Sequence, residues 1–298
     1  MKFITSIISA LYRVKRLLIP KIYIGRYPLF RQVKARFLAE RPIKVGQFQF
    51  FADKVDTLRL LGNRDYAQDE QSHFQSIIKP GYTCVDLGAN IGFFSVLFAH
   101  WTGPNGKVFA FEPSPENLVL LRKNLKINGI SNVEIVDKAV SDEEGVIKLH
   151  LCKDNFGDNR IYASEEEKDR KTVDIQAIKL DDFFASKSKP IDFIKMDIQG
   201  AELRALKGMK HLLENKQIQR ISMEFWPCGL VKSGSDPVEL LDLLLSYGFT
   251  LYDLYNGSLI ETSASSLIER YPASDNIFTN LYVTTDVNDV HLVSSAKI

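Results

Sequence analysis

The chain has 298 residues, of which 45% are hydrophobic, so it can bury one large core and still leave a segment beyond a catalytic domain of about 200 residues. Its formal net charge is only +1, which excludes a global bias toward polyanionic partners. The three cysteines are widely separated and lack metal-ligand spacing, which favours reduced thiols in a cytoplasmic protein over a disulfide framework or a zinc site.

The segment before Glu40 is strongly basic, with nine Lys or Arg residues and no acidic residue. Apolar residues from Ile4 to Leu18 recur at helical spacing, which predicts an apolar stripe flanked by basic side chains. We expect residues 1–20 to contact the inner surface of a membrane peripherally or, alternatively, to dock on the protein's own domain or on a second subunit. The apolar run is too short to span a bilayer, and Arg13 to Arg16 without a small-residue cleavage site argue against secretion.

The remaining elements alternate along the chain. Residues 1–65 are predicted as the basic amphipathic extension with a strand or hairpin arm at 42–53, and residues 66–298 as the catalytic domain. A polar helix at 66–78 ends at the breaker Lys79-Pro80-Gly81. The expected strands are 82–87, 107–111, 132–137, 191–197, 219–225, 249–255 and 280–285, and the expected helices are 92–101, 115–128, 201–213 and 238–247. Two strand-like pieces, 146–151 and 173–178, flank a polar loop. The alternation predicts an α/β fold with a Rossmann-like seven-stranded parallel sheet and helices on both faces.

The turn after the first of these strands reads Asp86-Leu87-Gly88-Ala89-Asn90-Ile91-Gly92. Gly88 and Gly92 let the backbone turn tightly and approach a ligand, and Asn90 suits a left-handed turn. Asp86 puts a carboxylate where such a sheet opens its ligand crevice. A dinucleotide site typically has the pattern G-x-G-x-x-G, which lets the pyrophosphate approach the helix N-terminus. The carboxylate of Asp86 would repel such a pyrophosphate. The ammonium group of S-adenosylmethionine would be attracted instead.

A second acid, Glu112, ends the next strand 20 residues after Gly92. At this position an acid accepts hydrogen bonds from ribose hydroxyls, each worth roughly 1.5 to 3 kcal/mol, so a free ribose is favoured over a 2′-phosphate. Any α/β protein can end one strand in Asp and turn on Gly. A third acid, Asp197, closes a later strand, and the three together predict S-adenosylmethionine as the cofactor. Seven strands also match a methyltransferase sheet better than the six of a dehydrogenase.

Four motifs resemble the FkbM family of methyltransferases over roughly residues 66–226. They are Val85-Asp86-Leu87-Gly88-Ala89-Asn90-Ile91-Gly92, Phe111-Glu112-Pro113, Ala139-Val140-Ser141 and Ile194-Lys195-Met196-Asp197-Ile198-Gln199-Gly200-Ala201-Glu202. The resemblance implies methyl transfer to oxygen, commonly on a sugar hydroxyl of a glycan or natural product. The residues predicted to bind the cofactor are Asp86, Gly88, Ala89, Asn90, Gly92, Glu112, Pro113, Asp137, Ala139 and Asp197. One departure is Gln199, where the family usually has Glu, which puts any mechanism relying on that carboxylate in doubt.

Methyl transfer to a hydroxyl mainly requires that the acceptor oxygen be aligned with the methyl group and that one proton be removed. Positioning supplies effective molarities of about 10⁵ to 10⁸ M, whereas a general base adds about 10² to 10⁴. Asp197 is the best-placed candidate base, with Glu202 and Glu224 as further catalytic candidates. Binding of the cofactor's amino group is an equal alternative for Asp197. The five histidines are scattered and no cluster of metal ligands stands out, so no metal site is predicted.

Substrate residues are expected in two places. Asp158, Asn159 and Arg160 in a polar loop suit sugar hydroxyls, with a solvated turn as the alternative. Trp226, after the fifth strand, suits the apolar face of a sugar ring, with a core-sealing cluster as the competing interpretation. Nucleic-acid substrates are disfavoured, because Asp197-Ile198-Gln199-Gly200 replaces the Asn/Asp-Pro-Pro-Tyr/Phe loop of base methyltransferases. A second hypothesis is a non-catalytic cofactor-binding or scaffold protein in a glycan assembly complex. Nothing in the sequence predicts an oligomeric state.

Overall fold

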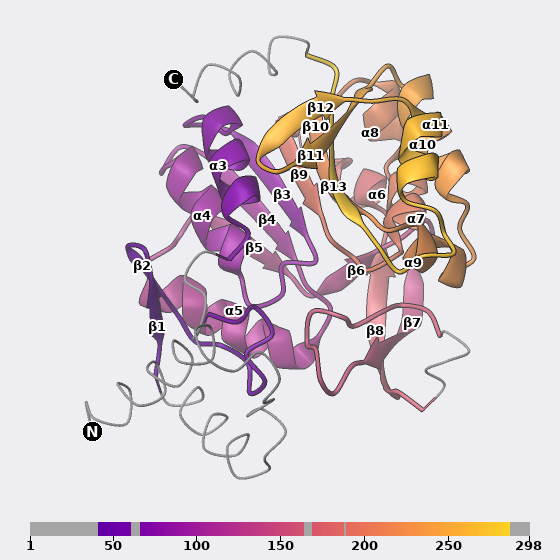
Figure 1. Cartoon of the computed structure of the whole chain (residues 1–298). Helices are drawn as coiled ribbons and strands as arrows, with labels where there is room; N and C mark the ends of the chain where they lie inside the picture. Colours follow the sequence, from indigo (N-terminus) through magenta and orange to yellow (C-terminus); the bar gives the residue numbers. More distant parts are fainter. Residues whose placement is uncertain (1–40, 61–65, 164–168, 188, 287–298) are drawn as a thin grey trace, which may run out of the picture.

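A mixed sheet of eight strands forms the centre of the molecule (Figure 1). The computed structural model describes residues 41–60, 66–163, 169–187 and 189–286. In spatial order the strands are β12 (Ser258–Glu261), β11 (Thr250–Tyr255), β13 (Thr279–Thr284), β10 (Arg220–Phe225), β9 (Phe193–Met196), β3 (Thr83–Leu87), β4 (Lys107–Phe111) and β5 (Val133–Val136). The strands from β10 to β5 run parallel, whereas β13 is antiparallel to both β10 and β11. The carboxyl ends of these parallel strands therefore lie side by side along one edge of the sheet.

Helices cover both faces of this sheet, as Figure 1 shows. One face carries α3 (Gln68–Ile77), α4 (Phe93–Thr102) and α5 (Pro115–Ile127), and the other carries α7 (Glu202–Lys207), α8 (Lys210–Glu214), α10 (Pro237–Ser246) and α11 (Ala264–Arg270). The shorter helices α6 (Leu180–Phe184) and α9 (Pro227–Lys232) complete the order. The side chains of successive strand residues pack into apolar clusters on opposite faces of the sheet, as those of Cys84 and Val85 do in β3. Burial on both faces explains the near-continuous apolar sequences of β3 and β9.

All seven expected strands are present, but the sheet has one strand more than predicted. The eighth, β12, forms a hairpin with β11 through Asn256 and Gly257, which both have positive φ. That two-residue turn is the one that an Asn-Gly pair favours. The helix expected at 201–213 is also divided, into α7 and α8. The carboxylate of Asp181 accepts hydrogen bonds from the backbone N–H groups of His211 and Leu212 at 2.9 Å, which satisfies the start of a separate helix.

Two smaller sheets flank the central one. The expected arm is a hairpin of β1 (Ile43–Val45) and β2 (Phe48–Phe50), held to α5 by hydrogen bonds between the Asn124 side chain and the Phe51 backbone. The pieces expected at 146–151 and 173–178 are β7 (Gly145–Leu151) and β8 (Lys171–Ile178), joined by β6 (Lys138–Val140). The predicted helix and membrane contact at residues 1–20 lie outside the described residues. Among the helices of the described ranges, none combines the length and apolarity needed to cross a membrane.

Candidate active site

Two adjoining cavities open at the carboxyl ends of the parallel strands. The larger, of about 340 Å³, lies over β3 and β4 and is bordered by the turn after β3. The smaller, of about 230 Å³, lies over β9, β10 and β13 and reaches α3. They share the side chains of Tyr66, Phe94, Lys195, Asp197, Glu224 and Phe278. Two ligands can therefore lie side by side, with these shared residues between them.

The turn after β3 packs tightly against the end of β9. Gly88 has φ +82°, and a Cβ there would overlap the backbone carbonyl of Asp197. Asn90 also has positive φ, at 52°. Gly92, at φ +84°, begins α4, and a Cβ there would overlap the side chain of Leu121 on α5. Gly88 thus lets the turn approach the site, whereas Gly92 permits helix packing and does not line either cavity.

Glu112 organises this turn from the tip of β4. Its Oε2 accepts a hydrogen bond from the backbone N–H of Asn90 at 2.7 Å, and its Oε1 accepts one from the N–H of Ser114 at 2.8 Å. The Nδ2 of Asn117 lies 3.4 Å from the same Oε1. Burial raises the pKa of Glu112 to about 7 although these donors favour the charged form. A buried carboxylate with remaining lone pairs therefore faces the larger cavity.

Three buried oxygen atoms in residues that line the larger cavity accept no hydrogen bond from the described residues. They are Oδ1 of Asp86, of Asn90 and of Asn117. Only the other carboxylate oxygen of Asp86 is satisfied, by the hydroxyl of Ser95 at 2.6 Å. An unsatisfied buried polar group costs about 1 to 3 kcal/mol. The cavity therefore fits a ligand rich in polar and positively charged groups.

Lys195 is a buried cation that lines both cavities, inside an otherwise apolar strand. It lies directly opposite Asp86 in the register of β9 and β3, and its Nζ is 3.3 Å from Oδ2 of Asp197. The Nζ also lies 4.9 Å from the centroid of the Phe94 ring. Burial lowers the pKa of Lys195, but Asp197, Asp86 and Glu70 outweigh that effect and leave the pKa above its usual value. Lys195 thus stays charged among several carboxylates.

Asp197 and Glu224 are joined through one amide. The Nε2 of Gln199 donates to Oδ1 of Asp197 at 2.7 Å and to Oε2 of Glu224 at 3.0 Å. Burial raises the pKa of Glu224 well above its usual value, and the charges of Asp197 and Glu202 raise it further. The Asp197 side chain is 36% exposed and keeps its contact with Lys195. Once ionised, Glu224 therefore accepts a proton readily.

Glu202, the third predicted catalytic carboxylate, does not line either cavity. It is fully buried at the start of α7, where its Oε1 accepts hydrogen bonds from the backbone N–H groups of Ile198 and Gly200 at 3.3 and 3.2 Å. Burial raises its pKa to about 7. Its contacts shape the turn after β9.

Most of the predicted cofactor residues come together. Asp86, Gly88, Ala89, Asn90, Glu112, Pro113, Ala139 and Asp197 all line the larger cavity. Asp137 does not, because its residue is exposed just before β6, while Ala139 turns inward. Asp137 stands between the end of β5 and the start of β6, where the chain passes from the central sheet to the three-stranded one.

The predicted substrate residues are mostly held in a cluster beside the cavities. Asp158 pairs with Arg160 and Arg170, each through an oxygen–nitrogen distance of 2.6 Å. The guanidinium of Arg160 lies 5.0 Å from the Trp226 ring, and the Trp226 Nε1 donates to Oδ1 of Asn276 at 3.0 Å. Trp226 is buried. Asp158, Arg160 and Trp226 therefore do not line either cavity, in agreement with the competing interpretation of Trp226, and only Asn159 lines the larger one.

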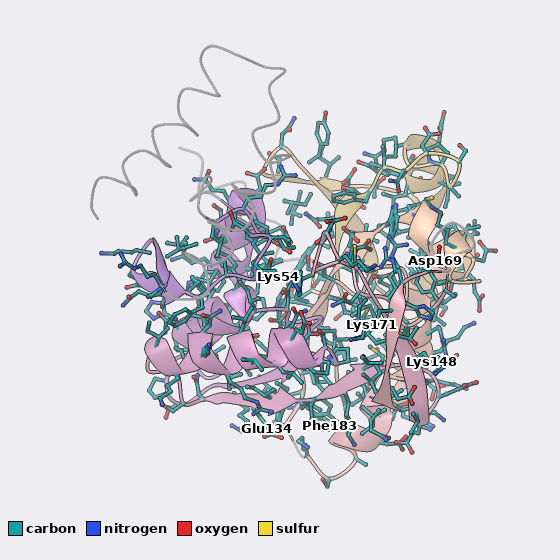
Figure 2. The ribbon with its side chains drawn as sticks, turned by 90° about the horizontal axis from the view of Figure 1, so that it is seen from below. Lys54, Glu134, Lys148, Asp169, Lys171 and Phe183 are labelled. Carbon is teal, nitrogen blue, oxygen red and sulfur yellow. The ribbon has the colours of Figure 1, made fainter. Side chains whose placement is uncertain are left out.

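The loop that carries Asn159 instead closes the larger cavity through Phe156. The backbone N–H of Phe156 donates to Oγ1 of Thr57 at 3.0 Å, and its carbonyl accepts from Nδ2 of Asn117 at 3.1 Å. Lys54, labelled in Figure 2, lies with its Nζ 4.9 Å from the centroid of the Phe156 ring. The cavity is thus bordered by a segment from the β7 region and by the segment after β2.

Sequence reasoning missed several lining residues. Tyr66, Glu70 and Phe278 line the smaller cavity, and the Phe278 side chain is 57% exposed. These residues come from segments far apart in the chain, so no local pattern marks them. Lys195 could have been noticed, because a charge within an apolar strand is unusual. Within the described ranges, no group of three or more His, Cys, Asp or Glu residues is arranged to hold a metal ion.

Comparison with known proteins gives a family match and several distant relatives. The family model of the methyltransferase FkbM domain matches residues 86–251, more than half of the chain. The chain is 28% identical over 161 residues to the 31-O-demethyl-FK506 methyltransferase FkbM of Streptomyces tacrolimicus, a match that covers 45% of this chain and 61% of that protein. It is 26% identical over 184 residues to the 2-O-methyltransferase NoeI of Sinorhizobium fredii, covering 57% and 73%.

A solved structure of methyltransferase FkbM from Methylobacillus flagellatus KT is 17% identical to the chain. The match has a TM-score of 0.42 and covers 86% of this chain and 59% of that one. The chain spans 57 to 67% of the length of the first three curated relatives that it matches.

Proposed function

The chain belongs to the FkbM family of S-adenosylmethionine-dependent methyltransferases, and we propose that it methylates a hydroxyl oxygen of a sugar in a glycan or a glycosylated metabolite. The observation that carries the proposal is the position of Glu224. This carboxylate lines both cavities, and its pKa is raised well above the usual value by burial. A proton acceptor between a cofactor cavity and a second cavity is what transfer to a hydroxyl requires.

The larger cavity would hold the cofactor. Asp86 and Asn90 offer unpaired buried oxygens to the amino-acid end, and Glu112 offers its carboxylate to the ribose hydroxyls. Ala139 and Phe156 supply apolar surface for the adenine ring of the cofactor. When bound, S-adenosylmethionine supplies a methyl group that its positively charged sulfur already activates toward oxygen.

The chain's own residues then have to align the acceptor and take one proton. Phe94 and Phe278 line both cavities and present apolar surface to the space between them. Asp197, whose Oδ2 lies 3.3 Å from the Nζ of Lys195, favours positive charge nearby. Glu224 accepts the proton of the acceptor hydroxyl as the new carbon–oxygen bond forms. Alignment supplies most of the rate, and the base adds about 10² to 10⁴.

The composition of the smaller cavity supports a sugar as the acceptor. Ser222 and Asn280 provide hydrogen-bonding groups, and the exposed ring of Phe278 provides an apolar platform. The Sinorhizobium relative is named as a 2-O-methyltransferase and the Streptomyces relative as a 31-O-demethyl-FK506 methyltransferase, and both names support an oxygen acceptor. Glu70 also lines the cavity, so an anionic acceptor is disfavoured.

The direct test is incubation with methyl-labelled S-adenosylmethionine and cell extract fractionated into glycan, lipid, protein and RNA. We expect label in the glycan fraction. Glu224→Gln should abolish the label while keeping affinity for S-adenosylhomocysteine within about threefold, whereas the exposed control Glu239→Gln should keep both. Label confined to RNA or protein would refute the sugar acceptor. Calorimetric binding of the cofactor with no label anywhere would favour the non-catalytic alternative.

A further inference from the structure

Gln199, between the end of β9 and the start of α7, lies in a constrained turn. Its φ is +56°, its carbonyl oxygen accepts a hydrogen bond from the Tyr162 hydroxyl at 2.9 Å, and the N–H groups on both sides of it bond to Glu202. A non-glycine residue with positive φ is uncommon and costs conformational energy. The turn therefore holds the side chain of Gln199 in one direction.

That direction is toward two carboxylates. The Nε2 of Gln199 uses both of its hydrogen-bonding positions, one on Asp197 at 2.7 Å and one on Glu224 at 3.0 Å. Neutral amide donors stabilise two neighbouring negative charges that would otherwise repel each other. A Glu side chain at the same place, when ionised, could donate to neither.

The two carboxylates differ in how many of their oxygens accept a hydrogen bond from the described residues. Asp197 has both oxygens engaged, Oδ1 by Gln199 and Oδ2 by Lys195. Glu224 has Oε2 engaged by Gln199, while its Oε1 has no hydrogen-bond partner among the described residues. Glu224 thus keeps one oxygen that accepts no hydrogen bond from the described residues, whereas each oxygen of Asp197 already accepts one.

We propose that Gln199 is a positioning residue whose amide ties Asp197 to Glu224 and thereby makes Glu224 the proton acceptor of the reaction. The inference rests on the proposed methyl transfer. The acceptor's proton goes to Oε1 of Glu224, and the oxygen lone pair forms the bond to the methyl carbon while the sulfur–methyl bond breaks and S-adenosylhomocysteine leaves with its electron pair. The Gln at position 199 is then a working part of the site and not a mark of lost activity.

The first test measures the protein without any acceptor. Carboxyl groups are labelled with carbon-13, and Glu224 is assigned by its disappearance in Glu224→Gln. Gln199→Glu should raise the apparent pKa of Glu224 by about one unit or more, because a third carboxylate lies beside the pair. Gln199→Met, which removes the donors without adding charge, should shift it in the same direction by less. Gln176→Glu, on the exposed side of β8, should leave it unchanged.

The second test is the pH dependence of kcat/KM with the labelled glycan fraction. The acid limb of the Gln199→Glu profile should move to higher pH by the same amount as the titration of Glu224, so the loss of rate should be largest at low pH and should shrink as pH rises. Activity lost equally at every pH, or an unchanged Glu224 titration in both Gln199 variants, overturns the role of Gln199. A wild-type protein that labels no fraction refutes the proposed function, and the titration, which needs no acceptor, keeps the two failures apart.

Discussion

Replacing Lys195 by Met removes the cation around which the carboxylates of the site are arranged. Lys195 is buried, lies opposite Asp86 in the sheet and is 3.3 Å from Asp197. Removing one partner of a buried ion pair costs about 3 to 5 kcal/mol, because the other charge stays behind. Asp197 is partly exposed and solvent screens it, so we expect the lower end, about 3 kcal/mol of unfolding free energy at pH 8.

The loss of unfolding free energy in Lys195→Met should be larger at high pH than at low pH. Burial already raises the pKa of Asp86 and raises that of Glu70 to about 7, and Lys195 opposes both shifts. Without Lys195 these folded-state pKa values rise further above the unfolded values. Such a shift lets the folded protein hold protons at low pH and destabilises it as pH rises through the folded pKa. The deficit of Lys195→Met should therefore be smaller at pH 5.5 than at pH 8.

Urea unfolding at both pH values measures the two deficits, with unchanged m-values confirming the comparison. The matched control is Lys148→Met on β7, labelled in Figure 2, whose ion pair with Asp174 is exposed and should contribute less than about 1 kcal/mol. A Lys195→Met protein as stable as the wild type at pH 8, or equally destabilised at both pH values, would contradict this electrostatic account.

Gly88→Ala should weaken S-adenosylhomocysteine binding at least tenfold in calorimetry, because its Cβ would overlap the Asp197 carbonyl; affinity within twofold of the wild type argues against the tight turn. Glu112 and Glu202 have pKa values of about 7 when folded, so their contribution to stability is complete below about pH 4.5 and is lost as pH rises through 7. Urea midpoints measured against pH should fall over that range, and they should fall less in Glu112→Gln. If the curves of the wild type and of Glu112→Gln are parallel, Glu112 does not contribute to this pH dependence. Deleting residues 1–20 should abolish sedimentation with anionic vesicles, and unchanged sedimentation removes the membrane contact.

The cofactor end of the site could be predicted from sequence because its residues follow strand ends. Asp86 and Glu112 each close an apolar segment, and parallel strands bring such ends to one edge. The acceptor end could not, because it depends on tertiary contacts. Nothing near Trp226 reveals that Asn276, in a distant loop, holds it inside. The approach of Tyr66 to Phe93 with ring centroids 5.0 Å apart is equally nonlocal.

The fold shows the same division. Alternating apolar segments identified the seven expected strands, whereas the eighth needed closer attention to Asn256-Gly257, a turn signal that was readable. The division of the helix at 201–213 depends on Asp181, which caps α8 from another element. Likewise, the position of Lys195 opposite Asp86 follows from strand pairing, which periodicity alone does not determine.

The most direct measurement is calorimetry of the full chain with S-adenosylmethionine, S-adenosylhomocysteine and NAD in parallel. If carboxylates at neighbouring strand ends hold a positively charged sulfur compound, the first two should bind with micromolar affinity and the dinucleotide should give no heat. Asp86→Asn should weaken S-adenosylmethionine and S-adenosylhomocysteine to a similar degree, because both carry the ammonium group that the Asp86 carboxylate would hold. Tight binding of NAD with none of either sulfur compound would contradict the account at its base.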